Sequence, residues 1–152
     1  MKYVFFLFIF IFIIASPSSF SETINCPQDY DKVFRMILET NGSCEQSFRL
    51  GDACRMGSSA DTQISNAINI VCNEELEHLK PSKERQDELA HCRKLCIEKY
   101  IHEEGTLSIS LRSFCYSEQG RRLVEILNEE STRTKPGKKR KICEPDEDIP
   151  LS

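Results

Sequence analysis

Eight cysteines follow an apolar leader in this chain, and their pairing limits its possible folds more than any other feature. An even number of cysteines in an exported chain indicates a framework of up to four disulfides. Metal binding would need clustered CxxC or HxxxH spacing, which the sequence lacks, so we expect neither a metal nor a cofactor. The pairing stays open at this point. The cysteines are Cys26, Cys44, Cys54, Cys72, Cys92, Cys96, Cys115 and Cys143.

The leader has the pattern of a secretory signal peptide. Lys2 precedes an apolar run from Tyr3 to Ala15, and small residues follow before Glu22. The alternative, a retained membrane anchor, would need about 20 apolar residues to cross a bilayer. We therefore predict a signal peptide at residues 1–21 and a secreted protein (periplasmic in a bacterium), with no membrane span once the leader is removed.

Charge and periodicity divide the rest of the chain into two parts. Residues 22–130 carry 13 Lys and Arg against 20 Asp and Glu, whereas residues 131–152 carry 6 basic and 4 acidic residues. An acidic body is unfavourable for binding nucleic acid or an anionic membrane. We expect a helical disulfide-rich domain at 22–130. The remainder, 131–152, is expected to be a charged, mostly disordered tail anchored by Cys143.

Residues 26–44 predict the first helix. Pro27 suits the first helical position, and Asn41-Gly42 supplies a stop. Asn41 also begins an Asn-Gly-Ser sequon, a potential N-glycosylation site in a eukaryotic host. The apolar side chains at the i, i+3, i+4, i+7 and i+8 spacing of one buried face are Tyr30, Val33, Phe34, Ile37 and Leu38.

Residues 58–80 predict a second helix, because apolar side chains keep a helical stripe until Pro81 ends it. Ser58 and Asp61 resemble a capping box at its start. Cys72 lies within the stripe and should face the core.

Residues 44–57 lie between these two helices. They contain two glycines and many polar residues. We interpret them as a disulfide-linked connection, with a short helix around Phe48 as the alternative.

Residues 82–104 read as a long helix that is capped by Ser82, ended by Gly105, and covered by polar side chains such as Arg85. Cys92 and Cys96 are four residues apart and so face the same side. Each should therefore bond to a different element.

Cys72 is a natural partner for one of these two cysteines. The following segment turns the chain, and Ser108 or Ser110 should cap a last helix over residues 110–130. Gly120 interrupts its apolar pattern, so this helix either bends there or divides into two short ones.

Taken together, the pattern predicts an all-α fold: a small disulfide-stapled bundle of four to five helices with an irregular C-terminal tail. The tail contains a basic run, Lys138–Lys141. Such a run is typical of a nuclear signal, a heparin-type patch or a processing site, and the leader disfavours the first of these. We interpret the run as a solvated linker.

Catalytic chemistry finds little support in the residues. His91 and His102 are separated by roughly 16 Å on a continuous helix, at about 1.5 Å per residue, so they cannot share one metal ion with His78. The acidic residues from Glu74 to Glu77 read as a solvated turn. No GxSxG, HExxH, phosphate-binding-loop or dinucleotide motif occurs. We expect that the protein is not an enzyme.

The cysteine pattern can be compared with those of two known families of small helical proteins. The opening CxxC of saposin-like lipid binders is missing. A small helical family of bacterial lysozyme inhibitors is similar in the order of Cys44, Cys54, Ala60-Asp61 and Cys96. Its typical tryptophan is absent, because the chain contains no Trp, and no family is assigned.

By subtraction, the favoured function is a secreted, non-catalytic protein that binds an extracellular protein partner. The first alternative is a carrier of a small apolar ligand or lipid, with a cavity between helices. A secreted hydrolase is the second alternative.

Overall fold

The computed structural model describes residues 24–40, 43–133 and 139–143, which contain five helices and no strand. The predicted signal peptide at 1–21 and the sequon asparagine, Asn41, lie outside these residues. The all-α disulfide-stapled bundle is confirmed. The helices are α2 (Tyr30–Leu38), α3 (Cys44–Ala53), α4 (Asp61–Leu79), α5 (Lys83–Lys99) and α6 (Gly105–Thr132).

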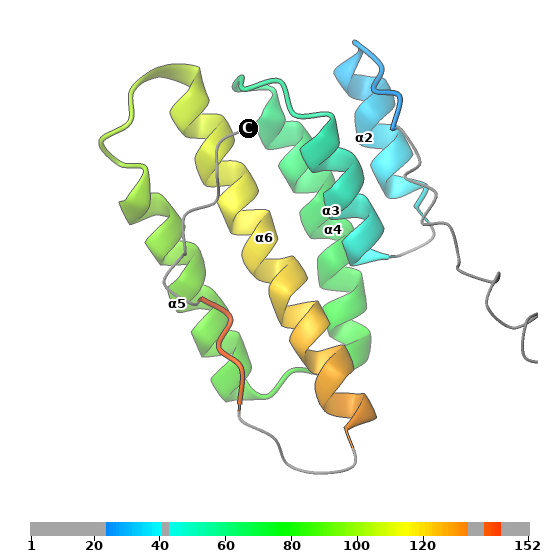
Figure 1. Cartoon of the computed structure of the whole chain (residues 1–152), viewed down its shortest axis with the longest axis vertical. Coiled ribbons are helices and arrows are strands. Elements are labelled where there is room, and N and C mark those ends of the chain that lie inside the picture. Colours follow the sequence, from blue (N-terminus) through cyan, green and yellow to red (C-terminus); the bar gives the residue numbers. More distant parts are fainter. Residues whose placement is uncertain (1–23, 41–42, 134–138, 144–152) are drawn as a thin grey trace, which may run out of the picture.

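The long helix α6 lies at the centre of the bundle (Figure 1). Helices α3 and α4 pack on one side of it and α5 on the other, while α2 packs on α3 and α4. Among the described residues, the backbone of α5 lies close to that of α6 and of no other helix. Helix α5 is therefore the helix with the least packing against the rest of the bundle.

All eight cysteines are paired: Cys26–Cys54, Cys44–Cys72, Cys92–Cys143 and Cys96–Cys115. Cys92 and Cys96 do bond to two different elements, and Cys143 does tie the tail to the body. The proposed role of Cys72 is wrong. It faces the amino end of α3 and bonds to Cys44, because α3 packs directly on α4.

The interpretation of residues 44–57 as a connection is also wrong over most of this segment, because Cys44–Ala53 is helical. The alternative, a short helix around Phe48, is the one that the structure shows. Ser43 caps this helix by accepting a hydrogen bond from the Gln46 amide. Glu75 of α4 accepts a second one from the Cys44 amide at 2.9 Å. Tertiary contacts thus stabilise a helix whose own sequence favours it weakly.

Gly51 allows α3 to approach α4 closely. A Cβ atom at this position would lie 2.5 Å from Ile68 Cδ1 and 3.0 Å from Ile64 Cγ2, and both side chains are fully buried. We expect Gly51→Ala to lower the free energy of unfolding by about 1–3 kcal/mol, as overpacking of a core does. Urea denaturation checks this. An alanine at the exposed Asp52 is the control, and an equal loss there would contradict the packing argument.

The predicted stripe of α4 is buried from Ile64 to Leu76, and Lys80 ends the helix in a left-handed conformation before Pro81. The capping box forms only in part. The Asp61 carboxylate accepts from the Ser58 amide at 3.1 Å, whereas the Ser58 hydroxyl bonds to Tyr30 instead.

Asp61 is fully buried and also accepts from the Met56 amide and the Ser110 hydroxyl. This side chain therefore joins the α3–α4 connection to α6. Ser110 is in the interior of α6, and so is Ser108. The predicted cap at Ser108 or Ser110 is therefore wrong, because α6 already begins at Gly105.

The boundaries predicted around these helices need three further corrections. Helix α2 begins at Tyr30, with Asp29 rather than Pro27 at its start. Helix α5 is capped by Ser82 as expected, but it ends at Lys99, before Gly105. Helix α6 continues unbroken through Gly120. The two-helix alternative is therefore wrong.

Gly120 leaves room for a side chain of α5 that crosses the surface of α6. Arg93 of α5 passes over it, with Nη2 3.1 Å from the place of a Cβ, and reaches Asn69 of α4 at 3.3 Å. The same guanidinium lies 4.1 Å from the centre of the Tyr116 ring. Arg93 thus joins the three longest helices.

Candidate functional site

The side chains that an enzyme or metal site would use are dispersed. His78, His91 and His102 are all exposed and lie on α4, on α5 and in the α5–α6 connection. In the part of the chain that the structure describes, no three His, Cys, Asp or Glu residues form a group fit for a metal ion. Every cysteine is in a disulfide, so none offers a thiol nucleophile.

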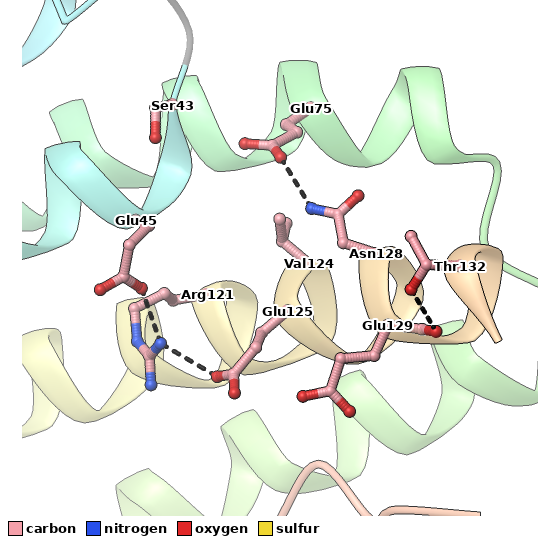
Figure 2. Close-up of a pocket in the computed structure, with 9 residues that line it drawn as sticks. All are labelled: Ser43, Glu45, Glu75, Arg121, Val124, Glu125, Asn128, Glu129 and Thr132. Atoms are coloured by element: carbon pink, nitrogen blue, oxygen red, sulfur yellow. Dashed lines mark hydrogen bonds and ion pairs between the residues drawn. The ribbon is translucent and has the colours of Figure 1, made fainter. Parts of the chain in front are cut away.

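An open groove lies between the amino end of α3, the carboxyl end of α4 and the carboxyl half of α6 (Figure 2). Its volume is about 590 Å³. Val124 is the one apolar residue in its lining. The lining residues are Ser43, Glu45, Glu75, Arg121, Val124, Glu125, Asn128, Glu129 and Thr132.

Arg121 is the main cation of this groove. It pairs with Glu118 and Glu45 at 2.7 Å and with Glu125 at 3.1 Å. The hydrogen bonds that Arg121 donates to Glu118 raise the pKa of its guanidinium, and Glu45 adds to this effect. The groove is thus acidic, and its one lining arginine is neutralised from three sides.

The role of Glu75 in this groove was not predicted from the sequence. The sequence placed it in a solvated acidic turn with Glu74 and Glu77. Glu74 and Glu77 are indeed exposed, whereas Glu75 caps α3 and also accepts from Asn128 of α6 at 3.2 Å. A carboxylate that joins three helices has no local signal, because its partners lie 31 and 53 residues away.

A second surface, the apolar end, consists of Met56, Ile97, Ile101 and Leu107. These side chains are 43, 49, 59 and 53 % exposed. Met56 lies in the α3–α4 connection, Ile97 in the last turn of α5, Ile101 in the α5–α6 connection and Leu107 in the first turn of α6. Both connections are at the top of Figure 1. Exposed apolar groups that gather in this way are characteristic of interaction sites.

Two observations show which parts of the apolar end lie close to one another. Leu107 Cδ1 lies 3.6 Å from the place of a Cβ on Gly57, next to Met56. The Ser108 hydroxyl donates to the Tyr100 carbonyl at 3.2 Å, which holds the end of α5 against the start of α6.

The third surface is the C-terminal strap, residues 139–143, which runs beside α5 (Figure 1). Lys139 pairs with Glu84 at 2.7 Å, the Ile142 amide donates to Glu88 at 3.0 Å, and Cys143 bonds to Cys92. Ile142 is fully buried. Lys139, Arg140 and Lys141 are exposed, as the solvated-linker interpretation expects, but Lys139 and Arg140 are also paired with α5 and α6. Lys138 and the rest of the tail lie outside the described part.

The charge of the strap is balanced by the body. Arg140 pairs with Glu125 and Glu129 of α6. Lys139, by hydrogen bond and by charge, holds the pKa of the Glu84 carboxyl below its ordinary value. This ion pair favours the docked strap above the ordinary carboxyl pKa and is lost as the pH falls through the lowered value.

Arg85 joins the strap to both neighbouring helices. It is only 3 % exposed, although the sequence placed it among the surface residues of α5. Its guanidinium bonds to Glu88 at 2.7 Å, to Glu130 of α6, and to the Arg140 carbonyl at 2.9 Å. Burial alone would lower its pKa, but the bonds to Glu130 and Glu88 raise it, so the group stays charged.

Comparison with protein-family models, curated proteins and solved structures finds no match. No helix in the described residues is both long and apolar enough to cross a bilayer.

Proposed function

We propose that this is a secreted, non-catalytic protein that binds another extracellular protein through the apolar end. The observation that carries the proposal is the exposure of Met56, Ile97, Ile101 and Leu107 at one end of a cross-linked bundle. Protein interfaces have apolar centres surrounded by polar residues. Here, the apolar end is flanked by charged residues of α5 and of the α5–α6 connection, such as Glu98 and Glu103.

The disulfides support this proposal, because a surface that is fixed before binding loses less conformational entropy when the complex forms. Cys96–Cys115 joins α5 to α6 one helical turn from Tyr100, at the base of the apolar end. Asp61 holds the α3–α4 connection to α6 on the other side. Both connections that carry the exposed side chains are thus fixed to the central helix.

The two alternatives have less support. A carrier of a lipid or small apolar ligand needs an enclosed apolar cavity, whereas the groove in Figure 2 is open and mostly charged. A hydrolase needs a nucleophile or activated water with a base beside it, and the three histidines stand apart on the surface. No observation specifically favours either function.

The test compares proteins retained from the relevant extracellular fluid by immobilised variants of the full chain. We expect the double variant Ile101→Asp, Leu107→Asp to retain at least tenfold less of a partner protein than the natural sequence retains. An apolar side chain buried at an interface contributes about 1.5–3 kcal/mol, and an aspartate would leave a charge unpaired there. Quantitative mass spectrometry gives the retained amounts.

Ile70→Asp is the matched control, because Ile70 is also an exposed apolar residue (45 %) but lies on the middle of α4. It should retain the partner fully. Equal retention by the double variant and the control, or retention of no protein at all, would refute binding through the apolar end. Circular dichroism confirms that both variants stay helical.

A further inference from the structure

We propose that the groove between α5 and α6, which the strap fills, is a latched binding site for an extended basic segment with an aliphatic residue. The chain's own strap occupies it while Cys92–Cys143 is closed. A partner segment of the same chemistry takes its place once a dithiol has opened that bond. This surface is distinct from the apolar end, and its test is independent of the proposed function.

The strap binds as a peptide ligand would. Its successive residues meet successive turns of α5: Lys139 meets Glu84, Ile142 meets Glu88 and Cys143 meets Cys92. The strap contains no helix or strand, and its main chain is recognised at two points. The Arg140 carbonyl accepts from Arg85, and the Ile142 amide donates to Glu88.

Ile142 supplies the apolar part of this recognition. Its side chain is fully buried and belongs to the same core as Leu89 of α5 and Ile126 of α6. An apolar anchor between two helices, fixed by main-chain hydrogen bonds on either side, is the arrangement by which grooves bind extended peptides. If the strap undocked, the buried site of the Ile142 side chain would become free.

Charge defines which segments fit. Carboxylates border the strap on both helices, with Glu84 and Glu88 on α5 and Glu125 and Glu129 on α6. Arg140 lies between the two α6 carboxylates, at 3.3 and 2.5 Å. The site therefore selects basic residues two and three positions before an aliphatic one, and it disfavours an acidic segment.

The latch is the Cys92–Cys143 disulfide. Cys92 is buried and Cys143 is only half-buried, so Cys143 is the more open of the two to an attacking thiolate. The thiolate of a dithiol forms a mixed disulfide with Cys143, and Cys92 leaves as a thiolate that takes up a proton. The second thiol of the reductant then displaces Cys143, so that the protein gains two thiols and the reductant becomes a disulfide.

Two facts explain why the closed form excludes a partner. In an oxidising compartment the bond stays formed. A tethered strap also competes at an effective concentration on the order of millimolar, which a free segment does not reach. Opening the bond allows the strap to leave and lowers this competition.

The experiment uses a fluorescent peptide with the sequence of residues 138–142 followed by serine. The protein is the full chain with Cys92→Ser, Cys143→Ser and Ile142→Asp, which unlatches the strap and removes its anchor. We expect this variant to bind the peptide at least tenfold more tightly than the oxidised natural chain, as measured by fluorescence polarisation. A peptide with aspartate in place of isoleucine should lose at least tenfold in affinity.

A disulfide-trapping measurement tests the same site without removing Ile142. In the full chain with Cys143→Ser, a peptide ending Lys-Arg-Lys-Ile-Cys should form a disulfide with Cys92 when glutathione disulfide is the oxidant. The aspartate peptide should react at least fivefold more slowly. Equal rates for the two peptides, or no peptide binding by a triple variant that keeps its helical circular dichroism, would overturn the proposal.

Discussion

Arg85→Ala is expected to lower the free energy of unfolding by about 3 kcal/mol. Arg85 is 3 % exposed and supplies the hydrogen bonds that join Glu88, Glu130 and the Arg140 carbonyl. Removing one partner from such a buried group leaves the others without compensation for their lost hydration, which costs several kcal/mol. Guanidinium chloride denaturation measures the change.

The effect should also be located in one part of the molecule. In the described part of the chain, the backbone of α5 lies close to that of α6 and of no other helix, and Arg85 is at the amino end of α5. Amide hydrogen exchange should therefore rise first in the amino half of α5 and in the strap. Arg133→Ala is the control, because Arg133 is exposed and, within the described residues, pairs with Glu129 four positions before it. Its expected cost is below about 0.5 kcal/mol, and an Arg85 variant as stable as this control would contradict the assigned role.

Replacing Cys44 and Cys72 together by alanine should cost about 4–5 kcal/mol, the largest loss expected from a change at two positions. Closing a loop of this length contributes roughly 3–4 kcal/mol by restricting the unfolded chain. Both sulfur atoms also lie in fully buried side chains, so their removal adds a cavity cost on the order of 1 kcal/mol. Thermal unfolding followed by circular dichroism gives the change.

The chain contains its own control for this prediction. Cys26–Cys54 has the same sequence separation of 28 residues, so its removal should cost the same chain entropy. Cys26 is only half-buried and precedes the first turn of α2, so the cavity cost is smaller there. The Cys44–Cys72 variant should therefore be the less stable of the two. The reverse order would show that burial of the sulfurs does not decide their contribution.

Local pattern was a good guide wherever a helix buries one continuous face. The stripe of α4 from Ile64 to Leu76 and the cap of α5 at Ser82 are as the sequence predicts. The separate destinations of Cys92 and Cys96 also follow from sequence, because residues four apart on a helix share a face. These features depend on the spacing of neighbours along the chain, and a single sequence contains that information.

Local pattern failed wherever a contact from a distant residue changes the cost of a conformation. Helix α3 forms despite Gly51 because α4 and α6 cover it and Glu75 caps it. Gly120 does not break α6, because Arg93 fills the space above it. Both residues looked unfavourable when only their neighbours in sequence were considered.

The sequence by itself determined an all-α chain whose cysteines cross-link its helices, because periodicity and cysteine number are properties of the chain alone. Only the tertiary structure decided the pairing, the burial of Arg85 and Ile142, and the surfaces that remain for a partner. The physical reason is that a disulfide, a buried ion pair and an exposed patch each depend on distances between residues far apart in sequence. Folding sets those distances, and for the strap they connect residues more than 50 positions apart.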